Sequence, residues 1–157
     1  MDEQMSNDKS KDPIIAYSMS AGCTACVALI TKDAIICANS GDSRCVLARG
    51  TQAIEMSEDH KPDNTEELRR IEAAGGFVEE GRVRGILSLS RALGDLEYKQ
   101  NKKIGVEAQM ITCVPEIKKV EISSEDKFLI IACDGIWDCL TSQQSVDLFH
   151  KSIKARK

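Results

Sequence analysis

Short apolar stretches alternate with polar turns between residues 26 and 56. Cys26–Thr31 and Ala34–Asn39 are apolar and β-prone, and Lys32-Asp33 between them predicts a hairpin with a two-residue loop. Arg44–Ala48 and Gln52–Met56 repeat the pattern after further turns. Four short strands at this spacing predict an antiparallel meander rather than a Rossmann-type parallel sheet.

A helical pattern follows, with its own start and stop signals. Asn64 and Glu67 have the spacing of a capping box, in which two side chains satisfy free amides at the helix start. Leu68 and Ile71 begin an apolar stripe that is wide enough to pack one face of a helix. Gly75-Gly76 predicts the end of the helix, because glycine readily adopts the conformation that closes one.

The next segment combines a small hairpin with a long loop. Phe77–Glu80 and Arg82–Arg84 flank Gly81 and predict the hairpin. Ile117–Ile122 alternates apolar and polar residues and predicts a half-buried strand. Between them, residues 96–113 are mostly polar and predict an excursion over the surface, with scattered apolar anchors at Tyr98, Ile104, Val106 and Met110.

An uninterrupted apolar run lies near the end of the chain. Phe128–Cys133 has no polar side chain and is bounded by charge on both sides, which predicts a strand buried on both faces. Asp134 follows directly, and an aspartate at the end of a buried strand is held rigidly where it can bind a metal or act as an acid or base. Asp134-Gly135 is also an ordinary turn signal. The run alone leaves both interpretations open, and Asp138 follows four residues later.

Polar segments mark both ends of the chain. Residues 1–13 are polar and lean acidic, which predicts a disordered segment before an ordered body that begins near Ile14. Ser142 is the expected N-cap of a last helix, with Val146 and Phe149 on its core side.

Composition and charge narrow the class of protein. A chain of 157 residues with 42% hydrophobic and 29% charged residues predicts one globular domain. The sequence contains no apolar run of membrane-spanning length and no apolar signal core at its start. The net charge of −4 argues against nucleic acid or an anionic membrane as the main partner.

The cysteines indicate the compartment. The chain has 7, an odd number, and most lie in apolar segments, which predicts reduced, buried thiols in a cytoplasmic or nuclear protein rather than a disulfide framework. Cys23 and Cys26 form a CxxC, the spacing of a redox pair or of half a zinc site. We discount both roles, because residues three apart on a strand point to opposite faces and no second ligand pair is present.

Several segments together resemble one family. In chain order they are Gly22–Ala25, Asn39–Arg44, Asp59–Pro62, Arg70–Gly76, Arg82–Gly85, Leu89–Asp95, Pro115–Ile117 and Ala132–Asp138. Each is weak alone, but their shared order over residues 20–150 resembles the metal-dependent type 2C (PPM) serine/threonine protein phosphatases.

The resemblance implies an α+β fold, a layered α/β/β/α sandwich of antiparallel sheets flanked by helices. It implies hydrolysis of phosphoserine and phosphothreonine in protein substrates by a water activated by two Mg²⁺ or Mn²⁺ ions, in a protein that is monomeric when complete. Such hard cations take oxygen ligands, so the site is expected to use aspartates and not the cysteines.

Residue by residue, the resemblance assigns few site positions. Asp134 matches a family ligand of the metal centre, and Asp138 matches an aspartate associated with a further, weaker metal. Asp59–Gly85 matches the start of the flap beside the family's cleft, where selectivity is thought to vary. His60 falls in that flap-side motif, so we interpret it as a loop histidine rather than a general acid.

Four other matched positions are interpreted as mainly structural, because charged residues in tight turns or buried pairs more often support the scaffold than catalyse. They are Asp42, Arg44, Arg91 and Asp95.

The resemblance is partial. The family's DGHGG motif, the acidic and arginine residues before it, and the closing Asp-Asn motif have no counterpart, so residues 14–157 are expected to be part of a catalytic domain that lacks its N-terminal third and C-terminal end. The 157-residue chain is therefore expected to be inactive or nearly so on its own. A fragment of a longer phosphatase is the first hypothesis, and the alternatives are a pseudophosphatase, a phosphoprotein-binding regulatory module or an unrelated scaffold.

Overall fold

The computed structural model describes Asp2 and residues 20–155. The predictions of a disordered segment over residues 1–13 and of a start near Ile14 lie outside the described residues, apart from Asp2. Two compact units emerge from the contacts between residues. The first unit comprises Met1–Ala25, Ser40–Asp42 and His60–Pro115, and the second unit comprises Cys26–Asn39, Ser43–Asp59 and Glu116–Lys157.

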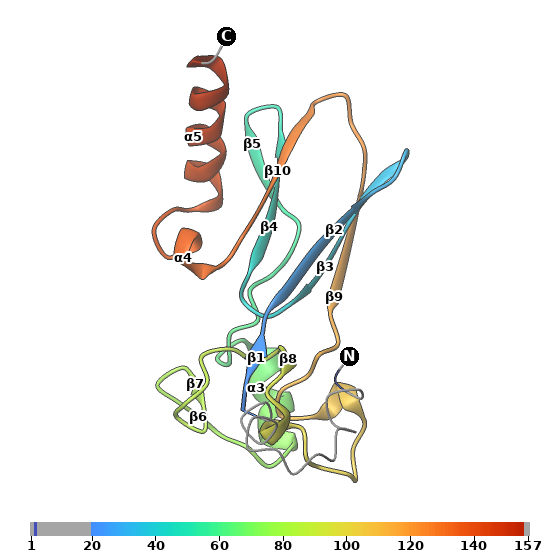
Figure 1. Ribbon diagram of the computed structural model, residues 1–157, viewed down its shortest axis with the longest axis vertical. Coiled ribbons are helices and arrows are strands. Elements are labelled where there is room, and N and C mark those ends of the chain that lie inside the picture. Colours follow the sequence, from blue (N-terminus) through green and yellow to red (C-terminus); the bar gives the residue numbers. More distant parts are fainter. Residues whose placement is uncertain (1, 3–19, 156–157) are drawn as a thin grey trace. The chain divides into compact units, whose positions relative to one another are not determined.

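The second unit is built on two antiparallel sheets. One has the order β2-β3-β9, and its strands are β2 (Ala25–Ile30), β3 (Ala34–Ser40) and β9 (Glu116–Glu121). The other has the order β10-β4-β5, and its strands are β10 (Asp126–Ala132), β4 (Arg44–Arg49) and β5 (Gln52–Glu55). Figure 1 shows both sheets in the second unit, with α5 alongside β5 and β10.

The hairpin predicted at Lys32-Asp33 forms, but the prediction of a single four-stranded meander is wrong. Thr31 N–H donates to Ala34 O at 2.8 Å and closes the predicted Lys32-Asp33 loop. β4 and β5 then pair in the other sheet, so the chain changes sheets between β3 and β4. The remaining neighbours of β3 and β4 are β9 and β10, which come much later in the sequence. Local alternation identifies strands, but it does not identify partners so distant in the chain.

β4 has a core on each of its faces. Cys45 and Leu47 face the other sheet and pack with Ile35 and Cys37 of β3. Val46 and Ala48 point the opposite way, toward the helices, and pack with a second set of side chains: Ile130, Trp137 and Val146. The unit is therefore layered as sheet, sheet and helix, since successive residues of a strand face opposite sides.

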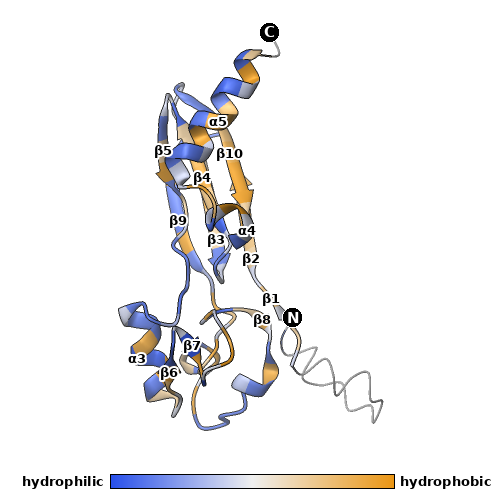
Figure 2. Ribbon diagram, turned by 90° about the vertical axis from the view of Figure 1, so that its left-hand side faces the viewer, coloured by the Kyte–Doolittle hydropathy of each residue, from blue (hydrophilic) through white to orange (hydrophobic). Residues whose placement is uncertain are grey.

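β10 is less buried than its sequence predicts. Ile130 is 8% exposed, whereas Ile131 beside it is 47% exposed. β10 lies at the edge of its sheet in the described residues, with β4 as its neighbour. The prediction of a strand buried on both faces is wrong for this structure, because one of its faces is incompletely covered. Figure 2 shows β10 as mostly hydrophobic and β9 as mostly hydrophilic.

The last helix, α5 (Ser142–Ala155), begins with a different cap from the predicted one. Thr141 N–H donates to Gln144 Oε1 at 2.9 Å, and Gln144 N–H donates to Thr141 Oγ1 at 3.2 Å. This reciprocal pair is a capping box, so Thr141 and not Ser142 is the cap. Val146 is buried as predicted, but Phe149 is 45% exposed, and its ring lies 6.1 Å from that of Phe128 between centroids.

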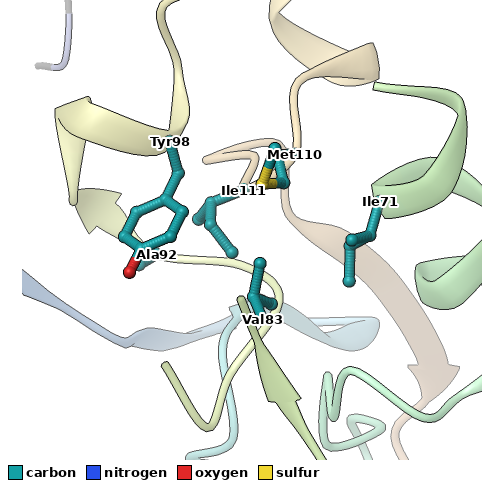
Figure 3. Packing of buried hydrophobic residues seen from close by; sticks show 6 residues of the cluster. All are labelled: Ile71, Val83, Ala92, Tyr98, Met110 and Ile111. Atoms are coloured by element: carbon teal, nitrogen blue, oxygen red, sulfur yellow. The ribbon is translucent and has the colours of Figure 1, made fainter. Parts of the chain in front are cut away.

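The first unit has less regular structure. Its elements are β1 (Gly22–Cys23), α3 (Thr65–Ala73), β6 (Val78–Glu79), β7 (Arg82–Val83), β8 (Leu93–Gly94) and the 3-10 turns η1 (Leu96–Tyr98) and η2 (Val106–Ala108). The predicted 77–84 hairpin is confirmed by the pairing of β6 with β7. Figure 3 shows the buried cluster that joins these elements: Ile71, Val83, Ala92, Tyr98, Met110 and Ile111. Two of the predicted loop anchors, Tyr98 and Met110, are thus confirmed, whereas Val106 is exposed.

Gly94 has no room for a side chain. β8 pairs with β1, and Gly94 has a φ of 76°. A Cβ at Gly94 would lie 2.4 Å from the carbonyl oxygen of Ala21. Both the close approach and the left-handed backbone require glycine here.

The predicted helix start holds an ion cluster instead of a capping box. Asn64 is the N-cap of α3 but makes no side-chain cap bond. Glu67 is 3% exposed and accepts hydrogen bonds from Arg91 Nη2 at 2.7 Å, Arg70 Nη1 at 2.7 Å and Ser90 Oγ at 2.5 Å. Burial alone would raise the pKa of Glu67, but the bonds from Arg91 and Ser90 and the charge of Arg70 outweigh it and lower the pKa to about 2. Two nearby guanidinium groups thus draw Glu67 away from the backbone amides that a capping box would engage.

The α+β class with antiparallel sheets and packed helices is confirmed. Among the described residues, no helix has both the length and the apolar character needed to span a membrane. All the cysteines are free, but only Cys37 and Cys45 are buried, so the prediction that most thiols are buried is wrong.

Candidate functional site

Asp134 stands where β10 ends and a short helix begins. β10 stops at Ala132, Cys133 is the N-cap, and Asp134 is the first residue of α4 (Asp134–Trp137). The side chain of Asp134 is exposed. Within the described part of the chain, no hydrogen bond or ion pair engages its carboxylate. The sequence-based placement of Asp134 at the end of a strand is therefore confirmed, and its oxygens are available to a ligand.

Trp137 fixes the corner between β10 and α4. Its indole N–H donates to the carbonyl of Ala132 at 2.8 Å, which ties the helix back to the last residue of the strand. The ring is nearly buried and packs with Val46 and Val146 beneath the sheet. A buried indole needs a hydrogen-bond partner for its N–H, and the Ala132 carbonyl provides it. The same bond joins residues on either side of Asp134 and so fixes the orientation of that residue.

Arg44 supports the same corner from the neighbouring strand. Its guanidinium binds Asp59 through two bonds of 2.8 Å, Nε to Oδ1 and Nη2 to Oδ2. The same group lies over the Trp137 ring at 5.1 Å and donates to Ser142 Oγ at 3.1 Å. The Asp59 bonds raise the pKa of Arg44 above its ordinary value, so the charge persists. Interpreting Arg44 as a structural residue agrees with these contacts.

Asp138 lies one helical turn beyond Asp134. It is the C-cap of α4, its side chain is exposed, and its backbone N–H donates to Asp134 O at 2.7 Å. Residues four apart on a helix share one side, so both carboxylates rise from the same side of this turn. Two exposed aspartates fit a hard divalent cation in ligand type, because Mg²⁺ and Mn²⁺ prefer oxygen. They are too few for a full coordination sphere, and residues 2 and 20–155 contain no group of three or more potential ligands able to hold a metal.

The remaining predicted positions lie in the first unit and make scaffold contacts. Lys61 Nζ donates to the buried Asp42 at 2.5 Å. His60 is buried, its Nδ1 lies 3.2 Å from the nitrogen and 3.1 Å from the carbonyl oxygen of Gly41, and its own carbonyl accepts the Ser90 N–H at 3.0 Å. These contacts agree with the interpretation of His60 as a loop residue.

Arg91 and Asp95 also serve the scaffold. Arg91 binds Glu67, as described above. Asp95 has a φ of 49°, and burial raises the pKa of its carboxyl. A Cβ at Gly22 would lie 2.1 Å from Asp95 Oδ2, so the two residues pack against each other closely.

Sequence reasoning missed the residues that support Asp134. Asp59 was interpreted only as the start of the flap segment, and no role was predicted for Trp137. A signal was available, because Trp137 is the only tryptophan in the sequence and lies three residues after Asp134. The partner of Arg44 could not be read from spacing, since the two residues lie on different elements.

The layered antiparallel sheets and the packed helices define an α+β sandwich, with an exposed carboxylate, Asp134, at the end of β10. A family model described as Protein phosphatase 2C matches residues 1–157. The chain belongs to the protein phosphatase 2C family.

Individual relatives agree with this membership. The chain is 52% identical over 135 residues to "Probable protein phosphatase 2C 21" of Arabidopsis thaliana, covering 86% of this chain and 38% of that protein. It is 53% identical over 127 residues to "Protein phosphatase ppm-1.G" of Caenorhabditis elegans, covering 81% of this chain and 26% of that protein. The chain thus spans well under half the length of these relatives.

Solved structures show the same fold. A phosphatase from a pathogenic strain of Toxoplasma gondii matches with a TM-score of 0.74 and 35% identity, over 78% of this chain and 39% of that one. A "C.elegans sex determining protein" matches with a TM-score of 0.77 and 31% identity, over 94% of this chain and 34% of that one.

Proposed function

We propose that this chain forms part of a protein serine/threonine phosphatase that hydrolyses phosphoserine and phosphothreonine with two Mg²⁺ or Mn²⁺ ions. The observation that carries the proposal is Asp134, an exposed carboxylate held at the end of β10 in a member of this family. When bound, the two ions supply an acidified water and neutralise charge on the phosphoryl oxygens.

The residues of this chain would position one wall of that centre. Asp134 would bind metal through its free carboxylate, and Asp138 would contact a further, weaker metal from the next turn. Trp137 and Arg44 would hold the corner rigid, because each has a fixed hydrogen-bond partner. Because the Asp134 carboxylate is already held in place, it loses little further conformational entropy when a metal binds.

A second candidate function is phosphoprotein binding without catalysis. It is favoured by one observation, that the described residues hold no group of three or more potential metal ligands. We expect the 157-residue chain alone to be inactive or nearly so, and activity to require a chain of its relatives' length.

A chimera separates the two candidates. Residues 20–155 would replace the matching segment of the Arabidopsis relative, and hydrolysis of p-nitrophenyl phosphate and of a phosphothreonine peptide would be followed with Mn²⁺, with Mg²⁺ and with chelator. We expect metal-dependent activity that Asp134→Asn lowers more than about 100-fold, since even groups that only orient ligands contribute 10- to 100-fold. The matched control is Asp147→Asn, an exposed aspartate on α5 that should leave activity unchanged.

The outcomes are distinct. Full activity in the Asp134→Asn chimera would refute the metal role of Asp134. An inactive chimera, together with specific binding of a phosphothreonine peptide by the 157-residue chain, would favour the binding module.

The location and partners follow as proposals. Free cysteines throughout the described chain support a reducing compartment, the cytoplasm or the nucleus. The partners would be phosphoprotein substrates, and the complete protein would be a monomer.

A further inference from the structure

Three thiols from three strands meet in the core between the two sheets of the second unit. Cys26 lies on β2, Cys37 on β3 and Cys45 on β4, and all belong to one packed cluster. The sulfurs of Cys26 and Cys37 are 3.9 Å apart, within reach of an S–H···S hydrogen bond. The CxxC partner of Cys26 in the sequence, Cys23, is exposed on β1, so the sulfur that meets Cys26 comes from across the hairpin.

The three thiols differ in access. Cys26 is half-buried, whereas Cys37 and Cys45 are buried. A small reagent from solvent therefore reaches Cys26 first, and the other two lie behind it. This order of access separates the roles of an attacking thiol and a resolving thiol.

The cluster also favours the thiolate at Cys26. A hydrogen bond from Cys45 is the main cause, and with the bond from Cys37 it outweighs burial and the charge of Asp59 and lowers the pKa of Cys26 to about 7. Burial raises the pKa of Cys37 to about 11, with Cys26 and Glu116 adding to the effect. The hydrogen bond to Cys26 raises the pKa of Cys45 as well. Of the three sulfurs, that of Cys26 therefore carries the negative charge most readily, and it is also the most accessible. Because the thiolate is the reactive form of cysteine, Cys26 is the reactive member of the cluster.

We propose that Cys26 is a peroxide-reactive thiol and that Cys37 resolves it into a disulfide across the β2–β3 hairpin. In the first step the Cys26 thiolate attacks one oxygen of hydrogen peroxide. An S–O bond forms, the O–O bond breaks, and the departing hydroxide takes a proton to become water. The sulfur is oxidised by two electrons to sulfenic acid, and the peroxide is reduced.

In the second step Cys37 gives up its proton and attacks the sulfur of Cys26. The S–S bond forms, the S–O bond breaks, and hydroxide leaves with that proton as a second water. The two sulfurs start 3.9 Å apart and need approach by only about 2 Å to reach a disulfide bond length. A dithiol reductant of the thioredoxin class would restore the two thiols by exchange and would itself become a disulfide.

Peptide mapping of the 157-residue chain tests the proposal without any variant. After treatment with a slight excess of hydrogen peroxide, a non-reducing map should show a Cys26–Cys37 disulfide with the loss of two hydrogens. A Cys23–Cys26 or Cys26–Cys45 disulfide, or faster oxidation at the exposed Cys133 or Cys139, would overturn it.

Variants then assign the roles. In Cys37→Ser the sulfenic acid should persist at Cys26 and be trapped by dimedone, whereas Cys26→Ser should form no disulfide. Cys139→Ser, at an exposed position outside the cluster, is the matched control and should behave as wild type. Trapping at Cys26 that is equal in wild type and Cys37→Ser would remove Cys37 from the mechanism.

The pH profile of alkylation tests the hydrogen bonds that activate Cys26. The rate of iodoacetamide labelling at Cys26 should have a midpoint near pH 7. Cys45→Ala removes a donor and should move the midpoint upward, while Cys45→Ser keeps an O–H donor and should restore part of the shift. A midpoint that is the same in all three proteins would contradict this activation. Circular dichroism confirms that each variant is folded before labelling.

Discussion

Replacing Glu67 with glutamine should destabilise the first unit far more than the same replacement at its neighbour Glu66. Glu67 is 3% exposed and is bound by Arg70 and Arg91, whose side chains are 13% and 20% exposed. Glutamine keeps the size and a hydrogen-bonding oxygen but removes the charge. Two largely buried guanidinium groups then lose their counter-ion.

Two independent estimates of the loss of unfolding free energy in Glu67→Gln agree. The pKa of Glu67 falls from an ordinary 4.5 to about 2. Each pH unit of such a shift corresponds to about 1.4 kcal/mol, so the contribution at neutral pH is on the order of 3 kcal/mol. Breaking a buried ion pair by removing one partner costs roughly 3–5 kcal/mol. We expect Glu67→Gln to lower the free energy of unfolding by about 3 kcal/mol.

The pH dependence has a definite sign. The folded pKa of Glu67 is depressed, so its contribution is fully present above the unfolded pKa and is lost as pH falls from about 4.5 toward 2. The difference in unfolding free energy between wild type and Glu67→Gln should therefore be constant near neutral pH and should shrink through this acidic range.

The assay must report on the first unit. The only tryptophan, Trp137, lies in the second unit, so its fluorescence follows the wrong part of the chain. Urea unfolding followed by circular dichroism, together with hydrogen exchange of the α3 amides, is suitable. Glu66→Gln is the matched control, because Glu66 and its partner Arg69 are 82% and 71% exposed and such pairs contribute about 0–1 kcal/mol.

Either of two results would refute this reasoning. One is an equal effect of the Glu66 and Glu67 substitutions. The other is a Glu67→Gln difference that persists unchanged at pH values below the folded pKa.

Two further predictions concern the corner at Asp134 and the turns. Arg44→Lys loses the two-bond contact with Asp59 and the stack on Trp137, so it should cost about 1–3 kcal/mol and change Trp137 fluorescence, and an unchanged emission spectrum would contradict the contact. Gly94→Ala should cost clearly more than Gly50→Ala in thermal unfolding, since both have positive φ but only at Gly94 would the new Cβ lie 2.4 Å from a carbonyl oxygen. A Cβ at Gly50 would meet open space, so Gly50→Ala should lower the free energy of unfolding by about 1 kcal/mol through backbone strain alone. Equal losses at the two positions would mean that the close contact at Gly94 adds nothing.

Local signals in the sequence predicted most of the strands, and they failed where partners are remote. The β2–β3 hairpin was predictable because its turn and both its strands lie within a few residues. The exposed face of β10 was not predictable, because the burial of a strand depends on what packs against it and not on its own composition. Phe128–Cys133 is apolar throughout, yet Ile131 is 47% exposed.

Side-chain competition explains the errors at the helix starts. Asn64 and Glu67 have capping-box spacing, but two arginines bind Glu67 more strongly than a backbone amide does. Arg70 lies one turn further along the same face of α3, and Arg91 comes from a remote segment. Ser142 is a good cap by residue type, but its hydroxyl donates to Glu55 at 2.9 Å and leaves the cap to Thr141. The position of Asp134 was predictable because it depends on one strand end, whereas its metal role stays a prediction that needs ligands from elsewhere.

The two anchored ends of β10 restrict how its length can change in evolution. Arg49 binds Asp126 at 2.6 Å where the strand begins, and Trp137 binds the Ala132 carbonyl at 2.8 Å where it ends. The ladder with β4 is irregular only between Asp126 and Phe128 and is in register from there to Ala132. A single inserted or deleted residue within that regular part would reverse the faces of every side chain between the insertion and the anchor. Homologous genes should therefore differ in this strand by substitutions, while insertions and deletions should be confined to the loop before it.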